Sequence, residues 1–121
     1  DRADVLFVPM AFDEQARSNM ILSFPSKLAD YTASGLPLLI HGPSDCSAAR
    51  WVRTRGEVAQ LVENPGAGLL GDAIELLRAT PARRWQLAQG AAAAGQDCFG
   101  PEAARQVLYA ALASPPIQRR P

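Results

Sequence analysis

The first half of the chain holds three short apolar runs separated by polar stretches. They cover residues 3–9, residues 36–40 and, more weakly, residues 57–62. Strands of a parallel sheet are buried on both faces, so they show continuous apolar runs instead of a strict alternation. The pattern therefore predicts three buried strands.

Helical periodicity begins between the first two runs. Residues 25–34 form one expected helix, because Pro25 suits a first helical position and Leu28 and Tyr31 fall on one face. Gly35 is expected to end this helix as its C′ residue. Residues 10–23 are polar and irregular, which predicts a loop.

The remainder of the chain is predicted to be mostly helical. A short helix is expected to run from a cap at Ser44 or Asp45 to about Arg53. Residues 64–68 are rich in turn formers and predict a connector. Three helices are then expected, at residues 72–79, residues 80–96 and from residue 100 onward. The last has an apolar stripe of Val107, Leu108, Ala111 and Leu112.

This order of elements is typical of an α/β fold with a parallel sheet. We expect a Rossmann-like parallel sheet with flanking helices over residues 1–113, and a flexible tail over residues 114–121. Because three strands make a narrow sheet with one unpaired flank, the segment is predicted to be the second half of a doubly wound domain. The chain also starts at Asp1, directly before a strand, which suggests a piece of a longer protein.

Charge and composition exclude several classes of function. Twelve basic and twelve acidic residues give a net charge of zero, which argues against a nucleic-acid-binding module. The apolar runs are too short to span a bilayer. Cys46, Cys98 and the single histidine, His41, match neither a disulfide framework nor a metal site, so no metal and no cofactor are expected. These features predict a soluble, intracellular protein.

The loop between the first two strands leads to a candidate anion site. Ser26 and Lys27 fall on the first turn of the expected helix, where free N–H groups, a hydroxyl and a full positive charge attract phosphate. Asp30 follows three residues later on the same face, where its carboxylate could accept both hydroxyl protons of a ribose. The alternative is an ordinary solvated pair of Lys27 and Asp30 on a surface helix.

The chain resembles the carboxy-terminal, donor-binding half of GT-B fold glycosyltransferases in two stretches, ADVLFVP (residues 3–9) and FPSKLADYTASGLPLLI (residues 24–40). The similarity is greatest to the retaining, family 4-like enzymes that build bacterial polysaccharides and glycolipids from nucleotide sugars. Many of them share the pattern Pro-Ser-Lys-Leu-x-acid-Tyr-x-Ala-x-Gly-x-Pro. The resemblance extends over roughly residues 3–112.

The resemblance implies roles for individual residues. Asp30 matches the second acid of the family's Glu-x7-Glu motif, which binds the ribose of the donor, and Ser26 and Lys27 face its diphosphate. The first acid is absent, because Leu22 stands in its place. The contact with the donor sugar is then expected from the preceding loop, at Arg17, Ser18 or Asn19, or at Asp13 or Glu14. No catalytic residue is identified.

Several other residues suggest chemistry, but we favour a structural interpretation for each. They are His41 after the second strand, the arginines at 50, 53 and 55 around Trp51, Cys46 near a helix start, and the glycines of residues 66–68. A neutral chain favours a solvated helix face over a nucleic-acid surface. The cysteine has no evident base partner, and two glycines in a turn are a weak phosphate-loop signal.

The leading hypothesis is a fragment of a glycosyltransferase that transfers a sugar from a nucleoside diphosphate to an acceptor with retention and without a metal. The alternatives are a non-catalytic, flavodoxin-like binding or regulatory module and a GT-B fold nucleotide-sugar epimerase. The fragment alone is expected to be inactive, because the amino-terminal part that completes the site is missing. The donor base, the sugar and the acceptor stay open.

Two further expectations concern partners and location. Nucleotide sugars are cytosolic, so the protein is expected in the cytoplasm, at the inner membrane if its acceptor is a lipid. An exposed sheet edge predicts a homodimer. The alternative is that the terminal helices fold back over the gap, using the apolar stripe that begins at Val107.

Overall fold

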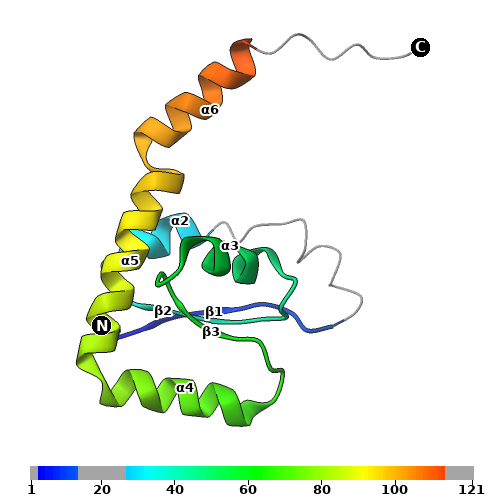
Figure 1. Ribbon diagram of the computed structural model, residues 1–121, viewed down its shortest axis with the longest axis vertical. Coiled ribbons are helices and arrows are strands. Elements are labelled where there is room, and N and C mark those ends of the chain that lie inside the picture. The colour runs from blue at the N-terminus through cyan, green and yellow to red at the C-terminus, as the bar shows by residue number, and fades with distance from the viewer. Residues whose placement is uncertain (1–2, 14–26, 114–121) are drawn as a thin grey trace.

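The computed structural model describes residues 3–13 and 27–113. That part of the chain contains the following elements, labelled as in Figure 1: β1 (Leu6–Pro9), α2 (Lys27–Thr32), β2 (Leu38–His41), α3 (Ser47–Arg55), β3 (Gln60–Val62), α4 (Ala67–Ala79), α5 (Pro81–Phe99) and α6 (Pro101–Ala113). The succession of strands and helices confirms the α/β class predicted from the sequence.

The strands form an open parallel sheet in the order β1-β2-β3. Leu6 of β1 lies opposite Leu38 of β2, and His41 of β2 lies opposite Val62 of β3. The prediction that the first two strands are parallel neighbours is therefore confirmed. Each strand begins later than its apolar run. Before β3 the reason is that Val58 is buried in the core but is not paired in the sheet.

One face of the sheet packs against α2, α3 and the second half of α5. Val8 of β1 and Leu38 and Ile40 of β2 belong to this first core, together with Leu28 of α2 and Trp51 of α3. Leu38 and Ile40 are two residues apart, as expected for side chains on the same face of a strand.

The opposite face of the sheet packs against α4. Leu39 of β2 and Val62 of β3 form this second core with Ala73 and Leu77 of α4 and Leu87 of α5. Because β2 packs against helices on both faces of the sheet, its sequence is a continuous apolar run. Phe7 of β1 stays 45% exposed, because α4 packs against β3 and leaves β1 less covered.

Helix α5 takes part in both cores. Leu87, in its first half, belongs to the second core, whereas Ala91 and Ala94 belong to the first. Figure 1 shows the helix running from the level of α4, past the side of the sheet where β1 begins, to the level of α2. One helix therefore connects the two layers.

Helix α3 has a different cap from the predicted one. Its N-cap is Cys46, whose Sγ accepts a hydrogen bond from the Ala49 N–H at 3.4 Å, and not Ser44 or Asp45. Cys46 is fully buried, so core packing places a thiol at a position where the sequence pattern favours a hydroxyl or a carboxylate.

Helix α4 begins at Ala67 and not at Asp72, so the predicted connector is too long. Gly66 is the N-cap, and Leu70 packs against the second core from the first turns of the helix. Burial of this leucine outweighs the low helix propensity of the glycines around it. The two following helices begin at Pro81 and Pro101, each one residue after the predicted start.

The terminal helix does not fold back over the sheet. None of the residues of α6 is buried, and Figure 1 shows the helix extending away from the other elements beyond the end of α5. The alternative in which the stripe beginning at Val107 covers the open flank is therefore wrong for this chain. The stripe is apolar, but Gly100 and Pro101 direct α6 away from the sheet.

No helix in residues 27–113 combines the length and the hydropathy required to cross a lipid bilayer. Even the longest, α5, has too low a mean hydropathy, because arginines, glutamines and glycines interrupt its apolar positions.

Candidate functional site

Parallel strands bring their carboxyl ends to one edge of the sheet. In this chain that edge is formed by Pro9 of β1, His41 of β2 and Val62 of β3, with the loops that follow them. Ligands of open α/β sheets bind outside this edge, where loops lead into helices. A ligand site in this fold is therefore expected at that edge.

Helix α2 presents Lys27 and Asp30 on its exposed face. Leu28 between them is fully buried in the first core, and Thr32, one turn later, is also buried. The Thr32 hydroxyl donates a hydrogen bond to the Ala29 carbonyl at 3.0 Å. Two anchored residues on one side of a short helix thus hold the cation and the carboxylate on the other side.

The helix lies close to α5 at a glycine. A Cβ at Gly95 would lie 2.3 Å from the Thr32 Oγ1, so only glycine allows this contact. Within the described residues, neither Lys27 nor Asp30 takes part in an ion pair. Both groups therefore face solvent and can contact a ligand.

The other predicted site residues lie outside the described part of the chain. These are Arg17, Ser18, Asn19 and Ser26, as well as Glu14 and Leu22. Asp13 is described and is exposed, in the loop after β1. The predictions for the donor-sugar loop therefore stay predictions.

His41, the last residue of β2, contacts the loops that follow β1 and β3; a structural role was favoured for it from the sequence, but these contacts were not predicted. Its Nε2 lies 2.7 Å from the Asn64 carbonyl oxygen, in the loop after β3. Its ring lies 4.9 Å from that of Phe12, after β1, and 6.4 Å from that of Phe7, centroid to centroid. The only signal in the sequence is a polar residue at the end of an apolar strand.

Replacing His41 by alanine is expected to loosen both neighbouring loops. The change removes a hydrogen bond with a net worth of about 1 kcal/mol and two ring contacts. Hydrogen exchange at the amides of Phe12, Asp13 and Asn64 should become several-fold faster, while the amides of α4 keep their rates. Unchanged exchange in both loops would show that His41 does not hold them.

Arg53 links two loops at the carboxyl edge of the sheet. Its guanidinium donates a hydrogen bond to the Ser44 carbonyl at 2.5 Å and forms an ion pair with Glu63, after β3. Arg55 pairs with Asp97 of α5. Because Arg53 and Arg55 both have carboxylate partners, the structure favours a neutralised helix face over a nucleic-acid surface.

Cys46 and the glycines of residues 66–68 have structural roles. The thiol of Cys46 is fully buried and caps α3, so it is not accessible as a nucleophile. The Gly66 N–H donates to the Asn64 Oδ1 at 2.7 Å, which closes a turn before α4. This geometry is that of a plain side-chain turn.

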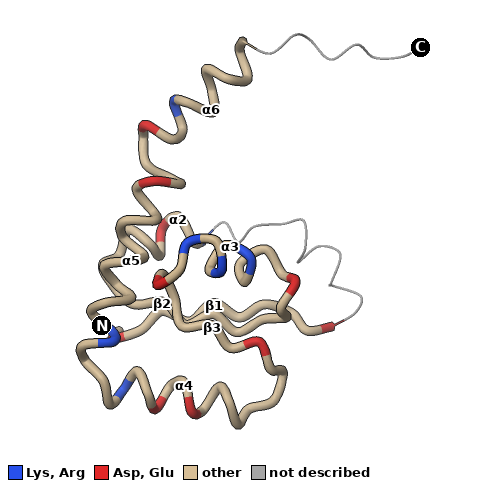
Figure 2. Tube along the Cα trace, viewed as in Figure 1, with Lys and Arg blue, Asp and Glu red and all other residues tan. Residues whose placement is uncertain are grey.

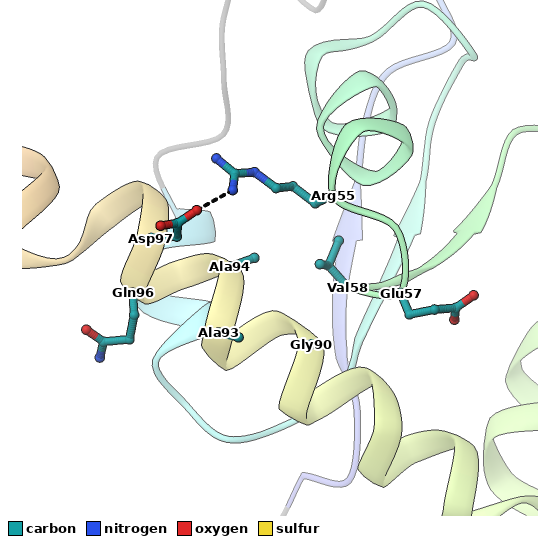
Figure 3. Close-up of a pocket in the computed structure, with 8 residues that line it drawn as sticks. All are labelled: Arg55, Glu57, Val58, Gly90, Ala93, Ala94, Gln96 and Asp97. Carbon is teal, nitrogen blue, oxygen red and sulfur yellow. Dashed lines mark hydrogen bonds and ion pairs between the residues drawn. The ribbon is translucent and has the colours of Figure 1, made fainter.

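A groove of about 680 Å³ lies elsewhere, between the loop that precedes β3 and helix α5. Figure 3 shows Arg55 and Asp97 facing each other across it, joined by a hydrogen bond of 2.6 Å that raises the pKa of Arg55. Val58 and Ala94 also line the groove and lie below this pair in the view. The loop leads into the amino end of β3, so the groove is separate from the carboxyl edge.

The described part of the chain thus shows two features that are candidates for a site: a cation and a carboxylate on the exposed face of α2, which lies beside α5, and a sheet edge held by His41 and Arg53. No protein-family profile, curated protein or solved structure matches the chain. Its function is therefore inferred from the residues and their arrangement.

Proposed function

We propose that the chain is part of the donor-binding domain of a GT-B fold, retaining glycosyltransferase. The observation that supports this most is the position of Lys27 and Asp30 on the exposed face of the helix that connects two adjacent parallel strands. In open α/β sheets the first turn of such a helix meets the ligand. The resemblance of residues 24–40 to donor-binding domains supplies the class of ligand, a nucleoside diphosphate sugar.

In this proposal Lys27 and Asp30 bind different parts of the donor. The ammonium group of Lys27 lies beside the diphosphate and stabilises the negative charge that develops on it when the sugar leaves. The carboxylate of Asp30 accepts hydrogen bonds from the ribose hydroxyls and so fixes the position of the diphosphate. Ser26 adds a hydroxyl donor at the start of the same helix.

The proposal also explains the open flank of the sheet. β1 pairs only with β2 among the described strands, so its other edge can take a further strand. We propose that the missing amino-terminal part of the parent protein pairs there and supplies the rest of the donor site. Transfer then requires the parent protein. It takes place in the cytoplasm, where nucleotide sugars are made, at the inner membrane if the acceptor is a lipid.

Nucleotide binding tests the proposal directly. We expect UDP, GDP or ADP to shift the amide resonances of the isotope-labelled chain around Lys27 and Asp30, with millimolar affinity, because half of the site is absent. Lys27→Ala should weaken binding roughly tenfold, the effect of losing one charge-assisted hydrogen bond. The wild type should prefer the ribonucleotide to its 2′-deoxy form, and Asp30→Ala should abolish that preference.

Helix α4 offers matched controls. Arg78 and Glu75 form an exposed ion pair with a distance of 2.5 Å, and replacing either by alanine should leave nucleotide binding unchanged. Equal weakening in these variants would show a non-specific charge effect. If no nucleotide shifts the resonances of α2, the donor-binding proposal is wrong and the flavodoxin-like module gains support.

A further inference from the structure

Helix α2 is held in place at two points. Leu28, beside Lys27 in the first turn, is fully buried in the first core. Thr32, the last residue of the helix, is only 2% exposed and packs against α5. A helix of six residues has too few hydrogen bonds of its own to keep its shape without such contacts. The position of its side chains therefore depends on both anchors.

The second anchor is a close contact between α2 and α5. A Cβ on Gly95 would lie 2.3 Å from the Thr32 Oγ1 and 2.5 Å from the Thr32 Cβ, which is closer than side chains approach each other. Rotation of the threonine cannot make room, because its Cβ stays in place when the side chain rotates. The Oγ1 would also give up its hydrogen bond to the Ala29 carbonyl. A larger residue at position 95 must therefore displace the end of α2.

Asp30 lies in the turn that this contact holds. Residues 29–32 form the last turn of α2, with Asp30 on its exposed side. Figure 2 shows the red, acidic segment of α2 beside α5, the helix that α2 packs against. A groove of about 310 Å³ between the two helices, lined mostly by alanines and glycines, leaves this turn room to move. Displacement of Thr32 therefore moves Asp30 with its turn, whereas Lys27 stays beside the anchored Leu28.

We infer that Gly95 and Thr32 are positioning residues that give the site its selectivity for ribose over deoxyribose. The inference rests on the proposed function, in which the Asp30 carboxylate accepts hydrogen bonds from the ribose hydroxyls. A hydrogen bond is largely lost when its donor and acceptor separate by a further 1 Å or about that distance. The attraction between Lys27 and a diphosphate is that of two charges, and it falls only gradually with distance. A shift of the last turn therefore affects the ribose contact much more than the phosphate contact.

Nucleotide selectivity of the isotope-labelled chain tests the inference. The probes are UDP, GDP and ADP, each compared with its 2′-deoxy form and with its monophosphate. We expect the wild type to bind the tightest diphosphate roughly tenfold more strongly than the 2′-deoxy form, the effect of one hydrogen bond to a charged group. Gly95→Ala should reduce this ratio to less than about twofold, as Asp30→Ala does. The ratio of diphosphate to monophosphate affinity, which reports the contact with Lys27, should stay unchanged.

These ratios separate positioning from stability. Partial unfolding lowers all affinities by the same factor and leaves both ratios as they are. Leu87→Ala is the matched control, because Leu87 is fully buried on the same helix but belongs to the second core, so this variant should lose stability and keep both ratios.

A double variant tests the contact itself. Thr32→Gly combined with Gly95→Ala moves the small residue from α5 to α2 and removes the overlap between them. This exchange should restore a preference for the ribonucleotide of about fivefold, because the effects of two residues in contact are not additive.

The outcomes distinguish this inference from the proposed function. A wild type that shows no nucleotide-induced shifts in α2, or no preference for ribose, overturns the proposed function and the inference with it. A wild type with the preference and a Gly95→Ala variant that retains it overturn the positioning role alone. An equal loss of both ratios in Gly95→Ala also overturns that role, because α2 would then move as one body.

Discussion

Leu28→Ala is expected to lower the free energy of unfolding by about 2–5 kcal/mol, the range for fully buried leucines. Leu28 has no exposed surface and belongs to the first core together with residues of β1 and β2. It is also one of the two residues that anchor the six-residue helix α2. Its loss should therefore affect both the stability of the fold and the position of Lys27 and Asp30.

Urea denaturation followed by circular dichroism measures this change. Leu76→Ala is the control, because Leu76 on α4 is 46% exposed, and its variant should stay within about 0.5 kcal/mol of the wild type. A similar loss in both variants would mean that α2 does not pack as described.

Gly90→Ala is expected to destabilise the protein by about 2–3 kcal/mol, even though alanine is the better helix former by about 1 kcal/mol. A Cβ at Gly90 would lie 1.9 Å from the Glu57 carbonyl oxygen and 2.9 Å from its carbon. These are backbone atoms, which cannot swing away as a flexible side chain does. The loop before β3 and helix α5 must therefore move apart.

Gly71→Ala is expected to change the stability in the opposite direction. Gly71 also lies inside a helix, α4, but a Cβ there would meet no atom within 4 Å. The gain in helix propensity is then not offset, and stability should rise by about 0.5–1 kcal/mol. Thermal unfolding of the two variants measured side by side gives the comparison, and a stabilising Gly90→Ala would contradict the close approach of α5 to the loop.

Local patterns in the sequence predicted the elements of the fold well. The apolar run of β2 is continuous because this strand is packed on both faces of the sheet. Gly35 has the expected left-handed φ of 79°, but α2 ends at Thr32, two turn residues before this glycine and earlier than the predicted Ser34. The boundaries were less predictable. Val58 packs in the first core from inside the expected strand but outside β3, and Leu70 packs against the second core from outside the expected helix but inside α4. The hydrophobic pattern alone does not show whether a buried residue belongs to a strand, a helix or a loop.

The candidate site was predictable only where it depends on neighbours in sequence. Lys27 and Asp30 are three residues apart, so their common face follows from helical periodicity. The contact of His41 with Asn64 joins residues 23 positions apart and depends on the pairing of β2 with β3. The position of α6 was unpredictable for the same reason, because an apolar stripe specifies a buried face but not the surface that covers it.

The course of α5 has a consequence for how the protein loses its structure. A helix that contributes Leu87 to one layer and Ala91 and Ala94 to the other cannot detach from one without disturbing the second. The two layers should therefore unfold as one cooperative unit, in spite of the small sheet between them. In native-state hydrogen exchange the slowest amides of β2, α4 and the middle of α5 should respond to denaturant with a common slope, whereas α6 should exchange through local fraying.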